Sequence, residues 1–321
     1  MEKAMGEAMD SVFLIDGHAD ILWRIDQEHL LFYEPTSALQ ASYQALRDGG
    51  VHLQFFAIFT DPKLTPADSL KAVLAYIDTF HRCIVSDRLQ PVYQYKDILK
   101  IRQSGQTGGM LSIEGAQCLQ GDIRMLHILY RLGVRAVGLT WNHANDIADG
   151  VGEPRGAGLS KFGRAVVAEM NRLGMIVDVS HLSERGFWDV AEQSTKPFIA
   201  SHSNCKAVFP HRRNLTDDQI HAIIAKSGTV GMTFVPDFIT DGPATVDDII
   251  RHIDHVLSLG GQKSIAFGSD FDGITETMVD LKRAKYFPIL LEQIEKRYGR
   301  DVLLDIAGRN LERVLHDVWN V

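Results

Sequence analysis

The chain has 321 residues, of which 45% are hydrophobic and 23% charged, and its formal net charge is −8 at pH 7. Together with a mean hydropathy of −0.06, this composition indicates a soluble globular protein with an extensive core and excludes fibrous, collagen-like and disordered chains. No long basic run would match nucleic-acid phosphates or anionic lipid, so neither nucleic acid nor a membrane is an expected partner.

Short runs rich in β-branched and aromatic residues alternate along the chain with longer amphipathic segments, as in βα units around a parallel sheet. Eight such runs predict strands, at residues 11–16, 51–59, 109–115, 134–141, 175–181, 197–203, 229–235 and 264–270. Helical periodicity predicts helices at 68–84, 122–133, 161–174, 183–194, 216–228 and 245–260. Several of these open with Ser, Thr or Asp and close on Gly, which are capping residues.

Eight units of this kind predict an α/β fold, a closed (β/α)8 TIM barrel, at roughly the length that such barrels need. An open doubly wound sheet would carry a Gly-rich phosphate loop after its first strand, whereas the sequence there is DGHAD. The Pro- and Gly-rich segments 61–69 and 149–160 are expected to be loops. No repeat or interdomain linker stands out, so we expect one domain over residues 1–321.

The cysteine pattern favours a reducing compartment. Cys83, Cys118 and Cys205 lie far apart, in an odd number and without CxxC spacing, and we interpret each as a buried small apolar group. The N-terminal stretch MEKAMGEAMDS lacks the positive start and apolar stretch of a leader, and no run of about 18 apolar residues occurs. These features predict a cytoplasmic protein.

Ligand-type side chains follow the predicted strands. The active sites of (β/α)8 barrels lie at the carboxyl ends of the strands, because the βα loops converge there. A single His at such a position is more often a hydrogen-bonded core or loop residue than a ligand, and we assign none of the nine histidines that lie elsewhere to a metal. The clustering at six of the eight strand ends nevertheless favours one shared site, formed by His18 and Asp20, Glu114, His143, His181, His202 and Asp270.

The donor types suit a divalent metal. In an extended segment His18 and Asp20 project to the same side and can hold one ion. Imidazole nitrogens and carboxylate oxygens suit Zn²⁺, with Mn²⁺, Fe²⁺ and Co²⁺ as alternatives. Glu114, His181 and His202 would form a second site, and a carboxylate using both oxygens could bridge two ions at ~3.5–4 Å.

A metal of this kind would supply a hydroxide nucleophile at neutral pH. The sequence contains no GxSxG motif and no Cys beside a plausible His partner, so water is the expected attacking group. Asp270 is placed to take the proton of that water and pass it to a leaving amine. Asp272, two residues farther into the loop, is the weaker candidate for this role.

Eight motifs in this order resemble the renal (membrane) dipeptidase family of zinc metallopeptidases, within the amidohydrolase-like barrels. They span about residues 12–316 and read DGHAD, SIEGAQ, GLTWNHAND, VDVSHLS, IASHSN, HRRNLTDD, AFGSDFDG and GRNLERVL. The resemblance implies a binuclear centre with two Zn²⁺ per chain bridged by Glu114. It places His18 and Asp20 on one ion, and His181 and His202 on the other.

The same resemblance implies roles for three further residues. His143 would polarise the scissile carbonyl, Arg213 would hold the free carboxylate of the substrate, and Asp270 would act as acid and base. A planar guanidinium pairs bidentately with a carboxylate, whereas a solvated surface position suits Arg212 better. The late Gly-Gly-Asn pattern of the family reads Gly308, Arg309 and Asn310 here, which leaves Asn310 without an assigned role.

The leading hypothesis is therefore a dipeptidase that hydrolyses a small peptide with a free C-terminal carboxylate, through a hydroxide bridging the metals. The substrates could include D-configured residues or a β-lactam amide. Another binuclear amidohydrolase, acting on a lactone, cyclic amide or N-acyl amino acid, is the first alternative, and a non-catalytic metal- or peptide-binding barrel is the second. The HxD motif and the bridging Glu favour the dipeptidase. The resemblance further implies a soluble bacterial-type member and a homodimer, with substrate preference set by loops 27–36, 61–66 and 145–158.

Overall fold

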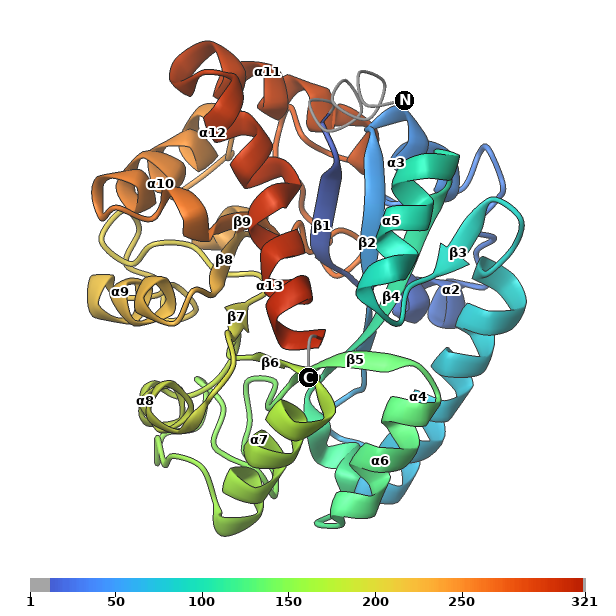
Figure 1. Ribbon diagram of the computed structural model, residues 1–321, viewed down its shortest axis with the longest axis vertical. Helices are drawn as coiled ribbons and strands as arrows, with labels where there is room; N and C mark the ends of the chain where they lie inside the picture. The colour runs from blue at the N-terminus through green and yellow to red at the C-terminus, as the bar shows by residue number, and fades with distance from the viewer. Residues whose placement is uncertain (1–11, 320–321) are drawn as a thin grey trace.

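The strands form one closed ring. The computed structural model describes residues 12–319, and eight parallel strands pair in the order β2-β1-β9-β8-β7-β6-β5-β4, with β4 pairing back to β2. Each predicted strand is present, and the closure confirms the predicted (β/α)8 barrel (Figure 1). The ring consists of β1 (Leu14–Ala19), β2 (Val51–Phe59), β4 (Thr107–Glu114), β5 (Val134–Gly138), β6 (Ile176–Asp178), β7 (Ile199–Ala200), β8 (Thr229–Met232) and β9 (Ile265–Phe267).

One short strand was not predicted. β3 (Leu89–Pro91) pairs with the first residues of β4, Thr107–Gly109, on the edge that β5 joins only from Leu111 onward. A three-residue segment that ends in Pro carries no alternating pattern, so the sequence gives no strand signal there.

Six helices in the outer layer match the predicted ones. They are α4 (Pro66–Thr79), α6 (Ile123–Arg131), α7 (Lys161–Leu173), α8 (Glu184–Gln193), α9 (Asp217–Ala225) and α10 (Val246–Ser258). Their N-caps are Ser, Thr or Asp, and in α9 the Thr216 and Gln219 side chains form a capping box. The prediction of a loop over 61–69 is wrong for its last four residues. Thr65 caps α4, and Pro66 occupies the first helical position, where a missing N–H costs nothing.

Other helices lie outside the predicted set. They are α2 (Ile21–Glu28), α3 (Tyr43–Asp48), α5 (Tyr95–Ser104), α11 (Phe287–Tyr298), α12 (Arg300–Leu304) and α13 (Asn310–Trp319), with a π-helical turn at Asp305–Arg309 between the last two. A second π-helical turn, Phe80–Ile84, continues α4.

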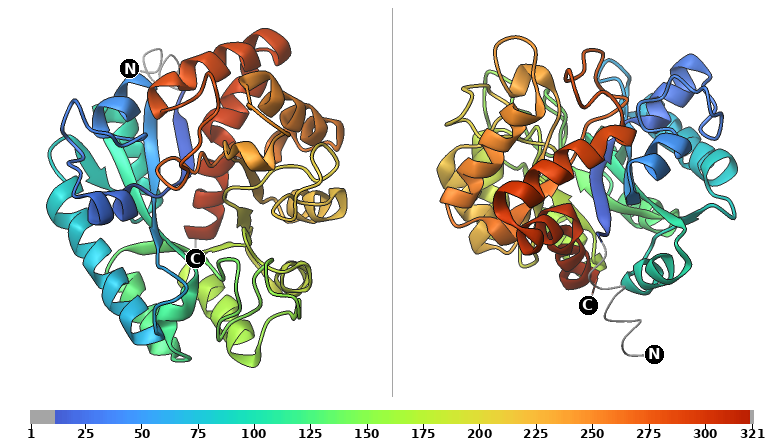
Figure 2. Two further views of the ribbon diagram at one scale, coloured as in Figure 1. Left: turned by 180° about the vertical axis from the view of Figure 1, so that it is seen from behind. Right: turned by 90° about the horizontal axis from the view of Figure 1, so that it is seen from above.

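Helix α13 closes one mouth of the barrel. Figure 1 shows it in red across the ring of strands, and Figure 2 shows the opposite side. Its apolar face belongs to the same buried cluster as inward-facing strand side chains such as Ile15, Phe55 and Met110. That face consists of Leu311, Val314, Leu315 and Val318. Since α13 fills the amino-terminal end of the barrel, the carboxyl-terminal end is left to the βα loops.

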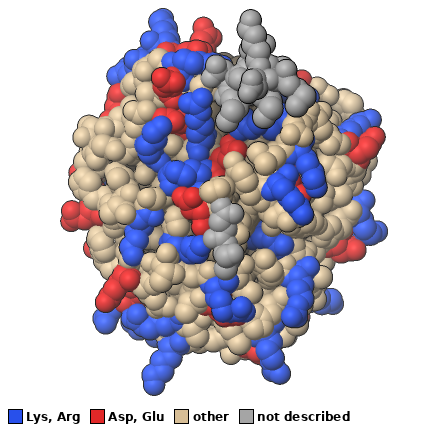
Figure 3. Space-filling view, viewed as in Figure 1, with Lys and Arg blue, Asp and Glu red and all other residues tan. Residues whose placement is uncertain are grey.

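The three cysteines, each predicted to be buried, differ in burial. Cys118 and Cys205 are buried, but the expectation is wrong for Cys83, which is exposed, and all three thiols are free. Among the helices of residues 12–319, none is both long and apolar enough to cross a membrane. Basic and acidic side chains are interspersed on the face seen in Figure 3. The leader expectation rests on residues 1–11, which lie outside the described residues.

Candidate metal centre

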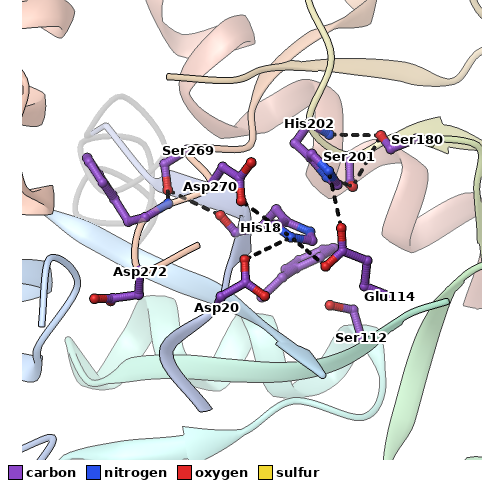
Figure 4. A network of polar contacts seen from close by, with 12 residues as sticks. His18, Asp20, Ser112, Glu114, Ser180, Ser201, His202, Ser269, Asp270 and Asp272 are labelled. Atoms are coloured by element: carbon purple, nitrogen blue, oxygen red, sulfur yellow. Dashed lines mark hydrogen bonds and ion pairs between the residues drawn. The ribbon is translucent and has the colours of Figure 1, made fainter. Parts of the chain in front are cut away.

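The carboxyl ends of five strands bring the predicted ligands together. Figure 4 labels His18, Asp20, Glu114, His202 and Asp270 among them. The ordered strands end earlier than predicted, so His181, His202 and Asp270 lie in the short loops that follow β6, β7 and β9. His181 and Asp270 have φ values of 67° and 65°, in the left-handed region that a residue other than Gly rarely adopts. Such backbone strain is concentrated at functional sites, where it directs side chains.

One group of donors surrounds His18. Its Nε2 lies 3.5 Å from Asp20 Oδ2, 3.8 Å from Glu114 Oε2 and 3.9 Å from Asp270 Oδ1. The backbone fixes this arrangement, because the Asp270 N–H donates to the His18 carbonyl at 3.1 Å and the Asp20 N–H donates to the Phe271 carbonyl at 2.8 Å. The end of β1 is thereby tied to the loop after β9.

A second group surrounds the other oxygen of Glu114. Glu114 Oε1 lies 2.8 Å from His181 Nε2 and 3.5 Å from His202 Nε2, and the two Nε2 atoms lie 2.8 Å apart. Glu114 therefore presents Oε2 to His18 and Oε1 to the two histidines. This is the geometry that a carboxylate shared between two ions would need.

Hydrogen bonds to the far side of each ring fix which nitrogen is unprotonated. The Ser201 hydroxyl donates to Asp178 Oδ2 at 2.5 Å, so it can only accept from His202 Nδ1, 2.8 Å away. His181 Nδ1 lies 2.9 Å from Asn142 Oδ1, which is also an acceptor. Both rings then direct their Nε2 lone pairs toward the same region, and two lone pairs 2.8 Å apart repel each other unless both nitrogens bind a cation.

The charges of the cluster also fit cations. Burial raises the pKa of Glu114 well above its usual value, and the Asp20 carboxylate raises it further. Burial, and then Asp20, raise the pKa of Asp270 to about 7. Burial lowers the pKa of His181 and His202 well below the usual value, which keeps both rings neutral. Buried His18 Nε2 and Asp20 Oδ1 have no hydrogen-bond partner among the described residues, as expected for atoms that bind a metal.

Asp178 is a residue that the sequence analysis missed. Its carboxylate lies close enough to His18 and His202 for the three side chains to hold one metal ion. Its oxygens are already used, because Oδ1 accepts from the N–H groups of Ser180 and Ser201 and Oδ2 accepts from the Ser201 hydroxyl. Asp178 thus orients His202 through Ser201. The available signal was an Asp inside a predicted strand, in VDVSH.

Arg213 lies beside the cluster. It is 5% exposed, its Nη2 donates to the His202 carbonyl at 3.1 Å, and its Cζ lies 5.5 Å from the centre of the Phe238 ring. Burial lowers the Arg213 pKa to about 10, although the Asp270 and Glu114 carboxylates oppose that shift. Its Nε is buried without a partner among the described residues, so the guanidinium retains a donor for a ligand.

His143 is not brought to the cluster. It is exposed and lies on the far side of Trp141, with ring centroids 5.6 Å apart. There it lines a cavity of about 280 Å³ together with Pro62 and Leu64. Its neighbour Asn142 faces the cluster instead, where it holds His181.

The cavity next to the donors has apolar walls. Its volume is about 270 Å³, and Asp20, Glu114 and Asp270 line its floor. The apolar lining comes from Trp23, Phe59, Trp141, Val235, Phe238 and Ile274. A small molecule with an apolar group can therefore reach the carboxylates, which is typical of ligand sites.

Two polar residues of the sequence motifs have structural partners. Asp272 accepts from the N–H groups of Gln40 at 2.7 Å and Ala41 at 3.0 Å, so it anchors the loop before α3. The Asn310 amide donates to the carbonyls of Gln262 at 2.7 Å and Ile265 at 2.8 Å, which ties α13 to the start of β9. Asn310 therefore has a role in folding, far from the donors.

Comparison with known proteins identifies dipeptidases as similar to this chain. The sequence profile of the membrane dipeptidases, peptidase family M19, matches residues 2–321. The dipeptidase aclJ of Aspergillus oryzae is 31% identical over 100% of this chain and 81% of its own length. An uncharacterized dipeptidase of Schizosaccharomyces pombe is 34% identical over 94% of this chain and 80% of its own. A metallopeptidase of Rhodobacter sphaeroides, solved with a phosphinate mimic of the dipeptide L-Ala-D-Ala, superposes with a TM-score of 0.89 at 25% identity, covering 96% of this chain and 100% of that one.

Proposed function

This chain belongs to the membrane dipeptidase family, peptidase family M19, and is a metal-dependent dipeptidase, and we propose that the cluster at the barrel mouth is its catalytic centre. The position of Glu114 is the main support for this proposal, because it presents one oxygen to His18 and the other to His181 and His202. We infer two ions from it, with His18, Asp20 and Glu114 on one and Glu114, His181 and His202 on the other.

The imidazole and carboxylate donors suit Zn²⁺, with no thiol required. When bound, such ions supply an acidified water molecule and a Lewis acid for the scissile carbonyl. The chain itself supplies the neutral rings, which Ser201 and Asn142 hold with Nε2 facing the ions. It also supplies the apolar walls that exclude bulk water from the reacting peptide bond.

Asp270 is proposed to move the proton. Its carboxylate lines the cavity and lies 3.9 Å from His18 Nε2. A carboxylate oxygen there would take the proton of the attacking water and return it to the nitrogen of the leaving amine. The φ of 65° at Asp270 directs the side chain into the cavity at a cost in backbone strain.

Arg213 is proposed to bind the free carboxylate of the substrate. Its buried guanidinium has an unused Nε–H and lies next to the aromatic wall at Phe238. The role suggested for His143, polarising the carbonyl, would require its loop to turn inward past Trp141. We further propose that residues 1–321 form one domain that acts on small peptides in the cytoplasm. We also propose that the protein is a homodimer, as the family resemblance implies.

The replacement Arg213→Ala tests this function through its substrate. We expect the KM for free dipeptides to rise about 30-fold or more, since a charge-assisted hydrogen bond to the carboxylate is lost. C-terminally amidated analogues of the same dipeptides lack that charge and should change by less than about threefold. The measurement is steady-state kinetics on the two substrate sets with the metal-loaded enzyme. Equal effects on both sets would remove the carboxylate role of Arg213.

A further inference from the structure

A second cavity lies on the other side of Arg213. Its volume is about 220 Å³, and His181 lines both this cavity and the apolar one. Its lining is more polar, with hydroxyl and amide groups from Ser183, Ser203, Asn214 and Thr216. Arg213 itself separates the two spaces, because it lines the polar cavity while its Cζ faces Phe238 of the apolar one.

The polar cavity has an excess of positive charge. Three cationic side chains line it, Lys206, Arg212 and Arg213, against two carboxylates, Glu153 and Glu184. Lys206 and Arg212 are both exposed at its rim. Within residues 12–319, neither Lys206 nor Arg212 takes part in an ion pair.

Two further features favour an anion. The Nε of Arg213 is buried without a partner in the described part of the chain, so the deepest cation of the cavity has a donor to offer. Helices α8 and α9 both begin at the cavity wall, at their caps Ser183 and Thr216. The amino-terminal end of a helix carries a partial positive charge, which the first-turn carboxylates Glu184, Asp217 and Asp218 offset in part, while the backbone N–H groups remain directed toward the cavity wall.

We infer that this cavity binds the side chain of the C-terminal residue of the substrate, and that the preferred side chain is a carboxylate, Asp or Glu. This inference rests on the proposed function. The α-carbon of the C-terminal residue carries both its carboxylate and its side chain, so a carboxylate held at Arg213 leaves the side chain close to Arg212 and Lys206. The N-terminal residue then lies in the apolar cavity, whose lining includes Trp23 and Phe59.

The test compares four dipeptides that differ only in the C-terminal residue, Ala-Glu, Ala-Gln, Ala-Lys and Ala-Ala, each with the L and D forms of that residue. Gln has nearly the shape of Glu without the charge. For the zinc-loaded enzyme we expect kcat/KM for Ala-Glu to exceed that for Ala-Gln by about tenfold or more, the effect of a charge-assisted hydrogen bond. The double variant Arg212→Ala, Lys206→Ala should reduce that ratio to within about threefold of one.

Arg131→Ala is the matched control, since Arg131 is exposed at the end of α6 and lines neither cavity. It should keep the wild-type ratio. A wild-type ratio near one, or a preference for Ala-Lys, would overturn the inference and leave the dipeptidase intact. An unchanged ratio in the double variant would also overturn it. Failure to hydrolyse any of the dipeptides would instead contradict the proposed function.

Discussion

The variant Asp270→Asn is expected to keep about two metal ions per chain and to lose activity by about 10³-fold, the size of effect that a general acid–base residue supplies. Asn has the shape of Asp but cannot exchange a proton. Asp270 lines the cavity and its carboxylate lies 3.9 Å from His18 Nε2, so it is placed to take the proton of the attacking water and give it to the leaving amine. The measurement is kcat on a good dipeptide, together with metal content by mass spectrometry.

The matched control is Asp241→Asn, because Asp241 is exposed and lines neither of the two cavities. It should retain both activity and metal. If Asp270→Asn instead loses one of its metals, Asp270 is a ligand, a role that its distance of 3.9 Å from His18 Nε2 would also allow. If the variant keeps most of its activity, another group moves the proton.

The variant Glu114→Gln is expected to weaken both metal sites and to abolish turnover. Each oxygen of Glu114 faces a different set of donors. The replacement removes one negative charge and one acceptor oxygen, so it should weaken metal binding at both sites. Changes to outer-shell partners alone cost about 10–100-fold in metal affinity, and removal of a ligand charge should cost at least about 100-fold at each site. The measurement is competition for Zn²⁺ against a chelator of known affinity.

Glu292→Gln serves as the control for this variant, since Glu292 is exposed on α11. It should bind two ions as the wild type does. Retention of two tightly bound ions by Glu114→Gln would rule out bridging. Loss of one ion, with the other unchanged, would assign Glu114 to a single site.

The strand ring could be predicted because each strand carries a run of β-branched or aromatic residues. Helices such as α9 could be predicted because a capping residue precedes an amphipathic segment. Helix α13 could also have been predicted, because apolar residues recur at helical spacing along its buried face, from Leu311 to Val318. Helix α3 has six residues, too few for periodicity to be visible.

The candidate site could be approached from sequence because parallel strands end at a common rim. The order of the strands and the residue after each one are sufficient to place these side chains together. The roles of Asp178 and Ser201 could not be predicted in this way, because they depend on which side chains face each other across neighbouring strands. The same reasoning included His143, which the structure places outside the cluster, because the path of its loop around Trp141 decides on which side of the cavity wall His143 lies.

We propose that residues from the first to the last barrel strand hold a pair of ions around Glu114. Anomalous diffraction at the zinc edge, from crystals of the zinc-loaded protein, measures this directly. Two peaks are expected, one between His18, Asp20 and Glu114 and the other between Glu114, His181 and His202. A single peak, or two peaks away from Glu114, would contradict it.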